Sequence, residues 1–171
     1  MEPFNSTTEP VKELGSVSEI NYIIEQLKDS FTGDPWFGRN ATALLAEVNE
    51  SNAFQKPANQ HSIVELVWHM VNWREFAISR IDTSAAKDLH YFEINDWRTV
   101  DHSDKEQLPL ALEQLNKTQE ELIHLISSKT DSWLNGNVAE RDYTYKKLLN
   151  GIIQHDIYHL GQIAYIVKML G

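Results

Sequence analysis

The sequence predicts an all-α protein built as a four-helix bundle. Apolar residues recur every three or four positions in four long segments, whereas no segment shows the strict alternation of an amphipathic strand. The chain has 171 residues, 42% of them hydrophobic, and no internal repeat, so one domain with a single core suffices. We expect this bundle over residues 16–171, preceded by a flexible N-terminal arm at residues 1–15.

The first helix is predicted to begin at Ser16 or Ser18 and to end at Ser30, because Ser16 and Glu19 have the spacing of a capping box. Its apolar stripe contains Ile20, Ile23, Ile24 and Leu27. The Gly-Asp-Pro sequence that follows predicts a turn. Trp36 and Phe37 lie in this turn, and their size leads us to expect that the loop folds over one end of the bundle. A short helix at residues 41–48 comes next.

The second long helix is predicted from Ser62 to Ile81, with Ser62 and Glu65 at capping-box spacing. Its buried stripe contains Ile63, Leu66, Val67, Met70, Trp73 and Ala77. Residues 82–102 have no regular pattern, and an irregular connection of about 20 residues is uncommon in a compact domain. A crossover that runs along the bundle to the third helix would explain its length.

The third long helix is predicted over residues 103–128, with an inner face of Leu108, Leu112, Leu115, Leu122, Leu125 and Ile126. Pro109 is unfavourable inside a helix, so either the helix starts properly near Leu108 or it is kinked in its first turns. Residues 129–143 have turn composition, and the fourth helix is expected from Thr144 to Leu170.

Composition restricts the chemistry and the partners of this chain. There is no cysteine, which excludes a disulfide scaffold, a cysteine nucleophile and thiolate metal ligands. The net charge of −10 disfavours nucleic acids and anionic membranes, so a small-molecule partner fits better. The polar start of the chain and the lack of a long apolar run lead us to expect a cytoplasmic protein.

Three histidines form the strongest functional pattern. His155 and His159 are four residues apart in an apolar helical segment, so both rings lie on one helix face and can bind a single metal ion. His69 lies in a second amphipathic helix and could complete a three-nitrogen site with an open coordination position, as in catalytic metal centres. The alternative is that these are buried histidines hydrogen-bonded to neighbouring groups.

The upstream ligand has a competitor, since His61, Glu65 and His69 follow one another at four-residue steps. Glu65 could accept a hydrogen bond from His69 and orient its ring, or it could serve only in the capping box. His90, His102 and His124 have no partner at ligand spacing and are expected to face solvent.

Three residues near the carboxy-terminal histidine pair also stand out. Asp156 occupies the place of the general base in the zinc-protease pattern His-Glu-x-x-His. We expect it instead to be solvated or to hydrogen-bond to a metal-ligating residue. Gly161 suggests a close approach of helices, and Gln162 could hydrogen-bond in the bundle interior.

With these residues, the sequence resembles the DinB-like superfamily of bacterial proteins, which includes the YfiT-type metal-dependent four-helix-bundle proteins. The resemblance rests on HSIVELVWHMVNWRE at 61–75 and GIIQHDIYHLGQIAYIVKML at 151–170, supported by Trp36-Phe37-Gly38 and Asp96-Trp97. It implies an up-down-down-up bundle with a long crossover between helices two and three. It also implies one divalent metal ion, nickel or zinc, held by His69, His155 and His159.

The same resemblance implies a metal-dependent thiol-S-transferase, which would use a low-molecular-weight thiol such as bacillithiol or mycothiol, or a hydrolase acting on a small molecule. The alternative is a non-catalytic metal-binding or stress-response interaction module. The basic residues that could hold an acidic thiol are Arg74, Arg80, Arg98 and Arg141.

Two further expectations concern the aromatic residues outside the long helices. Relatives of this kind often pair, and the aromatic side chains of Trp36, Phe37, Tyr91, Phe92 and Trp97 exceed what a small bundle buries, so we expect a homodimer. Segments 33–38 and 90–98 are expected either to line the metal pocket, with Trp36 or Trp97 near a bound ligand, or only to cap the core.

Overall fold

The computed structural model describes residues 18–170 and is helical throughout. Helices make up 68% of the structure, and the described residues contain no strand, only one isolated bridge between Asn137 and Thr144. The α-helices are α1 (Glu19–Phe31), α2 (Ala41–Leu45), α3 (Glu50–Ala53), α4 (Ile63–Ile81), α5 (Leu89–Ile94), α6 (Gln107–Ser127) and α7 (Tyr145–Leu170). Short 3-10 turns are η1 (Pro57–Asn59), η2 (Thr83–Ala85) and η3 (Asp131–Asn135). The all-α prediction is therefore confirmed, and the expected arm at residues 1–15 lies outside the described residues.

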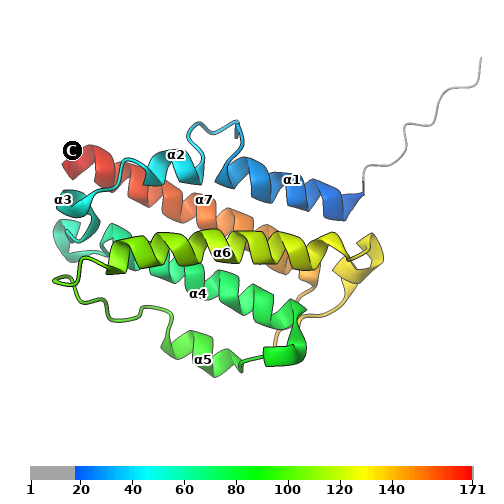
Figure 1. Cartoon of the computed structure of the whole chain (residues 1–171). Helices are drawn as coiled ribbons and strands as arrows, with labels where there is room; N and C mark the ends of the chain where they lie inside the picture. The colour runs from blue at the N-terminus through cyan, green and yellow to red at the C-terminus, as the bar shows by residue number, and fades with distance from the viewer. Residues whose placement is uncertain (1–17, 171) are drawn as a thin grey trace, which may run out of the picture.

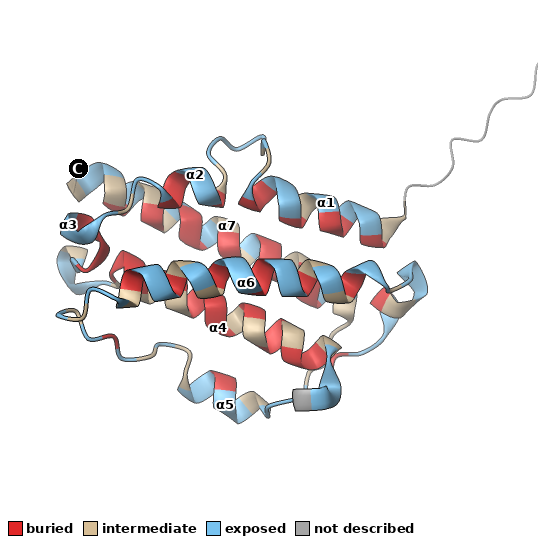
Figure 2. Ribbon diagram, in the orientation of Figure 1, coloured by how far each residue is buried: buried red, intermediate tan, exposed pale blue. Residues whose placement is uncertain are grey.

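The four long helices α1, α4, α6 and α7 lie side by side (Figure 1). α4 packs against α6 and α7, and α1 packs against the same two helices. Each helix turns its buried stripe toward the others, as Figure 2 shows, while α5 is mostly exposed. Within residues 18–170, no helix combines the length and the apolar composition needed to cross a membrane.

The apolar core consists of two clusters, one toward each end of the bundle. On α4, α6 and α7 they are separated by Arg74, Gln119 and Asp156, three buried polar residues that meet in the middle of the bundle. The Arg74 Nε donates to Asp156 Oδ2 at 2.9 Å, and its Nη1 donates to Gln119 Oε1 at 2.6 Å. We call these three residues the polar layer. Because a buried charge must be paired, these contacts join α4 to α6 and α7 in the middle of the bundle.

The start of α1 is capped by a residue far along the chain. Ser18 makes no capping bond to its own helix, and Ser16 lies outside the described residues, so the expected capping box is not seen. Instead, Asp131 accepts hydrogen bonds from the backbone N–H of Ile20 at 2.9 Å, the Ser18 hydroxyl at 2.7 Å and the backbone N–H of Glu19 at 3.0 Å. The same hydrogen bonds, led by that from Ile20, lower the pKa of Asp131.

The loop after α1 does not cover the bundle end. Trp36 is 101% exposed and Phe37 is 46% exposed, so the expectation that this loop buries its aromatic rings is wrong. Figure 1 shows the loop standing away from the helices. Its conformation is held by polar contacts: Asn40 caps α2 and donates to the backbone carbonyl of Gly33, and Arg39 pairs with Glu47. α2 ends at Leu45 rather than at residue 48.

α4 begins and ends as predicted, with a complete capping box. The Ser62 backbone N–H donates to Glu65 Oε2 at 2.9 Å, and the Glu65 N–H donates back to Ser62 Oγ at 3.4 Å. The connection after α4 runs back along the bundle before α6 begins (Figure 1). It contains α5, whose Phe92 is buried and is held by a hydrogen bond from Asn72 of α4 to the Phe92 carbonyl at 3.0 Å.

α6 begins at Gln107, four residues later than expected, which places Pro109 in its first turn. Proline is tolerated there because the first N–H groups of a helix have no intrahelical acceptor. Of the predicted inner face, Leu112 and Leu125 are only half-buried. α7 begins at Tyr145, one residue later than expected.

Candidate metal centre

Three imidazole nitrogens converge beside the polar layer. The Nε2 of His155 lies 2.9 Å from the Nε2 of His69 and 3.1 Å from the Nε2 of His159. His69 comes from α4, and the other two come from successive turns of α7. His69 and His159 are buried, whereas His155 is half-buried. The structure thus brings together the three histidines predicted from the sequence, and among the described residues they form the one group with metal-ligand geometry.

The ring of His69 is oriented by Asp96, in the crossover. Its Nδ1 lies 2.9 Å from the backbone carbonyl oxygen of Asp96, which can only accept, so Nδ1 carries the proton and Nε2 presents a lone pair. The Asp96 carboxylate lies 3.1 Å from the same nitrogen and also accepts from the indole N–H of Trp73 at 2.6 Å. The interpretation that Glu65 orients His69 is therefore wrong, because Asp96 holds this position.

The ring of His159 is oriented by Gln162 in the same way. Its Nδ1 lies 2.7 Å from the side-chain carbonyl oxygen Oε1 of Gln162, one turn further along α7. The expected hydrogen bond of Gln162 in the bundle is therefore present, and its partner is one of the three histidines. Such acceptors behind a ligand fix the ring orientation and raise its basicity toward a metal.

His155 is the least constrained of the three rings. Its Nδ1 has no hydrogen-bond partner, and the nearest carboxylate oxygen, Asp156 Oδ1, lies 3.8 Å away and is also unpaired. Asp156 itself is only 3% exposed and pairs with Arg74. The expectation of a solvated Asp156 is therefore wrong, and it is not free to act as a general base.

Burial keeps two of these imidazoles neutral at ordinary pH. Desolvation lowers the pKa of His159 to about 4 and also lowers the pKa of His69. With their Nδ1 protons engaged, both rings direct Nε2 lone pairs toward the Nε2 of His155, which can donate a proton to only one of them. At least one Nε2 lone pair therefore has no proton donor, and a bound cation would accept it.

The spacing of the three nitrogens also suits a metal ion. Imidazole nitrogens bind zinc at about 2.0–2.1 Å, so two ligands at 90–110° are separated by roughly 2.9–3.4 Å. The distances of 2.9 and 3.1 Å lie in this range. The residues present therefore fit a divalent ion in donor type and in the two distances to His155, and all three ligand atoms lie within 4.8 Å of one another.

The competing histidine, His61, lies outside this group. Its ring stacks on Trp97 with the centroids 3.5 Å apart, while His69 stacks on Trp97 at 3.9 Å. Segment 90–98 contacts the histidine group through Trp97, which favours the first of the two interpretations of this segment. The fully exposed Trp36 is not among the rings stacked there. His90 and His124 are exposed as expected, but His102 is only partly exposed and lies 3.5 Å from Glu65.

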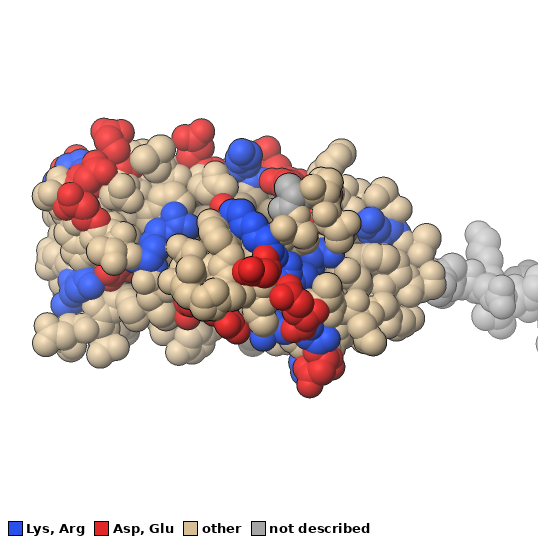
Figure 3. Space-filling view, turned by 90° about the horizontal axis from the view of Figure 1, so that it is seen from below, with Lys and Arg blue, Asp and Glu red and all other residues tan. Residues whose placement is uncertain are grey.

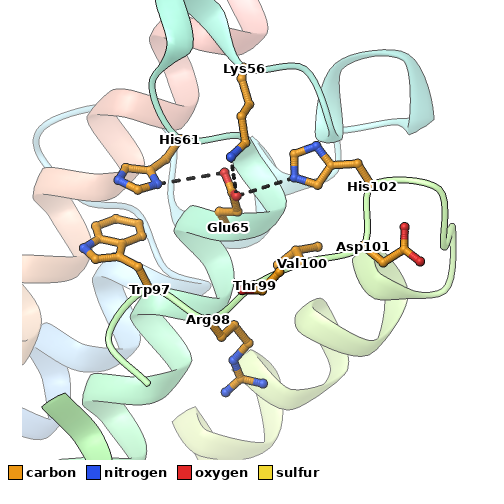
Figure 4. Close-up of a pocket in the computed structure, with 9 residues that line it drawn as sticks. All are labelled: Lys56, His61, Glu65, Trp97, Arg98, Thr99, Val100, Asp101 and His102. Carbon is orange, nitrogen blue, oxygen red and sulfur yellow. Dashed lines mark ion pairs between the residues drawn. The ribbon is translucent and has the colours of Figure 1, made fainter. Parts of the chain in front are cut away.

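Beside Trp97 is a hollow of about 550 Å³ in which Glu65 lies between Lys56, His61 and His102 (Figure 4). Burial works against the charged form of Glu65, but hydrogen bonds from Lys56 and Ser62 outweigh it and lower its pKa. Glu65 therefore stabilises the start of α4. The residue that orients His69 is Asp96, which the local spacing of the sequence did not identify.

Two of the arginines proposed to hold an acidic thiol are engaged inside the protein. Arg74 belongs to the polar layer, and the buried Arg80 pairs with Glu140 at 2.6 Å. Arg98 and Arg141 lie over the rings of Trp68 and Phe76, at 4.1 and 5.3 Å from the centroids. On the face that carries the crossover, basic and acidic side chains alternate (Figure 3). The thiol-clamping role is therefore wrong for Arg74 and Arg80.

Gly161 does not mark a close approach of helices, because no atom lies within 4 Å of the position its Cβ would occupy. That expectation is wrong, and Gly161 instead lies at an open surface groove.

Comparison with known proteins gives one match. The model of the DinB family matches residues 40–171, a range that contains α4, α7 and all three histidines. No curated protein and no solved structure matches the chain. Since the matched range covers well over half of the sequence, the chain belongs to the DinB family.

Proposed function

We propose that this protein is a metal-dependent enzyme that holds one divalent ion, nickel or zinc, on the Nε2 atoms of His69, His155 and His159. The observation that carries the proposal is the convergence of these three nitrogens, with His155 Nε2 at 2.9 and 3.1 Å from the other two, which belong to rings held neutral by burial. When bound, the ion would supply Lewis acidity, which lowers the pKa of a coordinated thiol or water.

The protein's own residues prepare the site in three ways. Asp96 and Gln162 fix the ring orientation of His69 and His159, so that little rearrangement is needed on binding. Trp97 covers one face of the His69 ring and excludes water from it. Arg74 pairs with Asp156, so this buried carboxylate does not offset the positive charge of an ion held by three neutral ligands.

The reaction we favour is transfer of a small thiol to an electrophile, with hydrolysis as the second possibility. Hydrolysis in the zinc-protease manner uses a carboxylate as general base next to the first histidine. Here that position is Asp156, which is buried and paired with Arg74. Thiol transfer would require no such base, because a bound ion would itself lower the pKa of the thiol.

The test begins with metal uptake by the full chain. We expect one zinc or nickel ion per chain by elemental analysis, none in His155→Ala or His159→Ala, and strongly weakened binding in His69→Ala. His61→Ala is the matched control and should retain the ion, since His61 stacks outside the group.

Activity is then measured with cysteine or bacillithiol and 1-chloro-2,4-dinitrobenzene. In this reaction a carbon–sulfur bond forms, chloride leaves and the thiol proton passes to solvent. We expect metal-dependent product formation that is lost in His155→Ala. Stoichiometric metal without turnover of thiols or of activated esters would instead identify a non-catalytic metal-binding module.

A further inference from the structure

An apolar groove runs along α7 away from the histidine group. It has a volume of about 680 Å³ and lies between the carboxy-terminal half of α7 and the segment from η1 to the first turns of α4. Its apolar walls are formed by Leu66, Tyr165, Ile166, Met169 and Leu170. Tyr165 and Met169 are 70% and 49% exposed, so within residues 18–170 these side chains are largely uncovered.

The groove adjoins the candidate metal centre through two of its lining residues. Gln162 lines the groove, and the same side chain accepts the hydrogen bond from His159. His61 also lines it, and His61 stacks on the Trp97 ring that covers His69. A molecule lying in the groove is therefore separated from His159 by the side chain of Gln162, and from His69 by the stacked rings of His61 and Trp97.

Gly161 keeps the wall of this groove open. Glycine is the least favourable residue in a helix interior apart from proline, yet Gly161 lies well inside α7. Apart from its chain neighbours and the backbone of its own helix, no described atom lies within 4 Å of its missing Cβ, so packing does not require a glycine here. What the missing side chain leaves free is space in the groove, immediately before Gln162.

We propose that this groove binds the apolar part of the substrate, while a polar end of the same molecule reaches the three histidines. The substrate class is a small molecule with a metal-directed polar group and an alkyl or aryl body. The proposal rests on the proposed function, because the polar end needs the metal. The groove volume falls within the range of about 300–1,000 Å³ that is usual for small-molecule sites.

A second groove on the same helix provides the matched comparison. It has a volume of about 290 Å³, and it is lined by His155, Trp73, Phe76 and Ile152 together with Gly151. Gly151 also has no atom within 4 Å of its Cβ position. Leucine at either glycine therefore adds the same volume to one groove or the other, and each replacement favours the helix.

The experiment uses two hydroxamates as probes, which share a metal-binding head and differ in their apolar tail. Binding of acetohydroxamate and octanohydroxamate to the zinc-loaded protein is measured by isothermal titration calorimetry for the wild type, Gly161→Leu and Gly151→Leu. The readout is the ratio of the two affinities within each protein, so changes in head binding cancel. Each fully buried methylene contributes up to about fourfold.

We expect octanohydroxamate to bind the wild type at least about tenfold more tightly than acetohydroxamate. Gly161→Leu should reduce this ratio to about one, and Gly151→Leu should leave it unchanged. Equal affinity of the two probes in the wild type, or loss of the ratio only in Gly151→Leu, would overturn the proposal. So would sedimentation showing that Gly161→Leu dissociates a dimer, because the groove would then be filled by a second copy.

Failure of the proposed function gives a different result. In that case none of the three proteins takes up zinc when it is titrated without a hydroxamate, and the groove proposal is rejected as well. Uptake of one zinc ion with equal affinity for both probes leaves the metal centre intact and rejects only the groove.

Discussion

Replacing Gln162 with leucine tests how the protein prepares His159 for a metal. The change removes the acceptor 2.7 Å from His159 Nδ1 and keeps a side chain of similar size. It leaves the N–H of a ring that is only 4% exposed without a partner. The hydrogen bond to Gln162 favours the protonated ring and opposes the larger effect of burial, so its loss should lower the pKa of His159 further.

The expected loss of zinc affinity follows from the role of Gln162 as the hydrogen-bond acceptor of the ligand His159. Loss of such a partner weakens metal binding by about 10- to 100-fold, which corresponds to roughly 1.4–2.7 kcal/mol. Zinc affinity is measured at pH 7 by competition with a chromophoric chelator. Gln154→Leu is the control, because Gln154 is an exposed residue on the same helix that makes no contact with His159 Nδ1.

We expect Gln162→Leu to weaken zinc binding by at least tenfold and Gln154→Leu to change it less than twofold. Equal zinc affinity in Gln162→Leu and the wild type would refute the reasoning, since His159 would then hold its orientation without Gln162. Equal weakening in both variants would assign the effect to the change in helix polarity.

Three further predictions follow from the same structure. Burial lowers the pKa of His159 from 6.5 to about 4, so on acidification the unfolded chain binds this proton first, and the free energy of unfolding of the metal-free protein should decrease as the pH falls from 6.5 to 4. Urea unfolding at a series of pH values measures this decrease, and an equal decrease in His159→Gln would contradict the prediction. Arg74→Met should lower the free energy of unfolding by about 3–5 kcal/mol, because it leaves Asp156 buried and unpaired, and an unchanged urea midpoint would argue against the ion pair. Light scattering should give twice the 19.7 kDa chain mass at micromolar concentration, whereas a monomer would reject the homodimer.

Much of the fold was predictable because its signals are local. The capping box at Ser62 and Glu65 and the apolar stripe of α4 determine where that helix begins and which face is buried. The four-residue spacing of His155 and His159 places both rings on one side of α7 whatever the tertiary structure. Pro109 indicates the first turn of α6, but it does not determine how many helical residues precede it.

The partners that complete the site were not predictable, because they lie far along the chain. Asp96 is 27 residues from His69 and approaches it only when the crossover folds back along α4. Asp131 caps α1 from a distance of 111 residues and has no local sequence signal for this role. Trp36 is the opposite case: a large ring generally favours burial, but no part of residues 18–170 covers this one.

The position of a metal ion in a crystal would show whether the three histidines bind it together. Crystals of the protein with one equivalent of zinc, measured at the zinc absorption edge, should show one anomalous peak about 2.1 Å from the Nε2 atoms of His69, His155 and His159. A peak beside His61, Glu65 and His102, or the absence of any peak between the three predicted ligands at full zinc loading, would contradict the account.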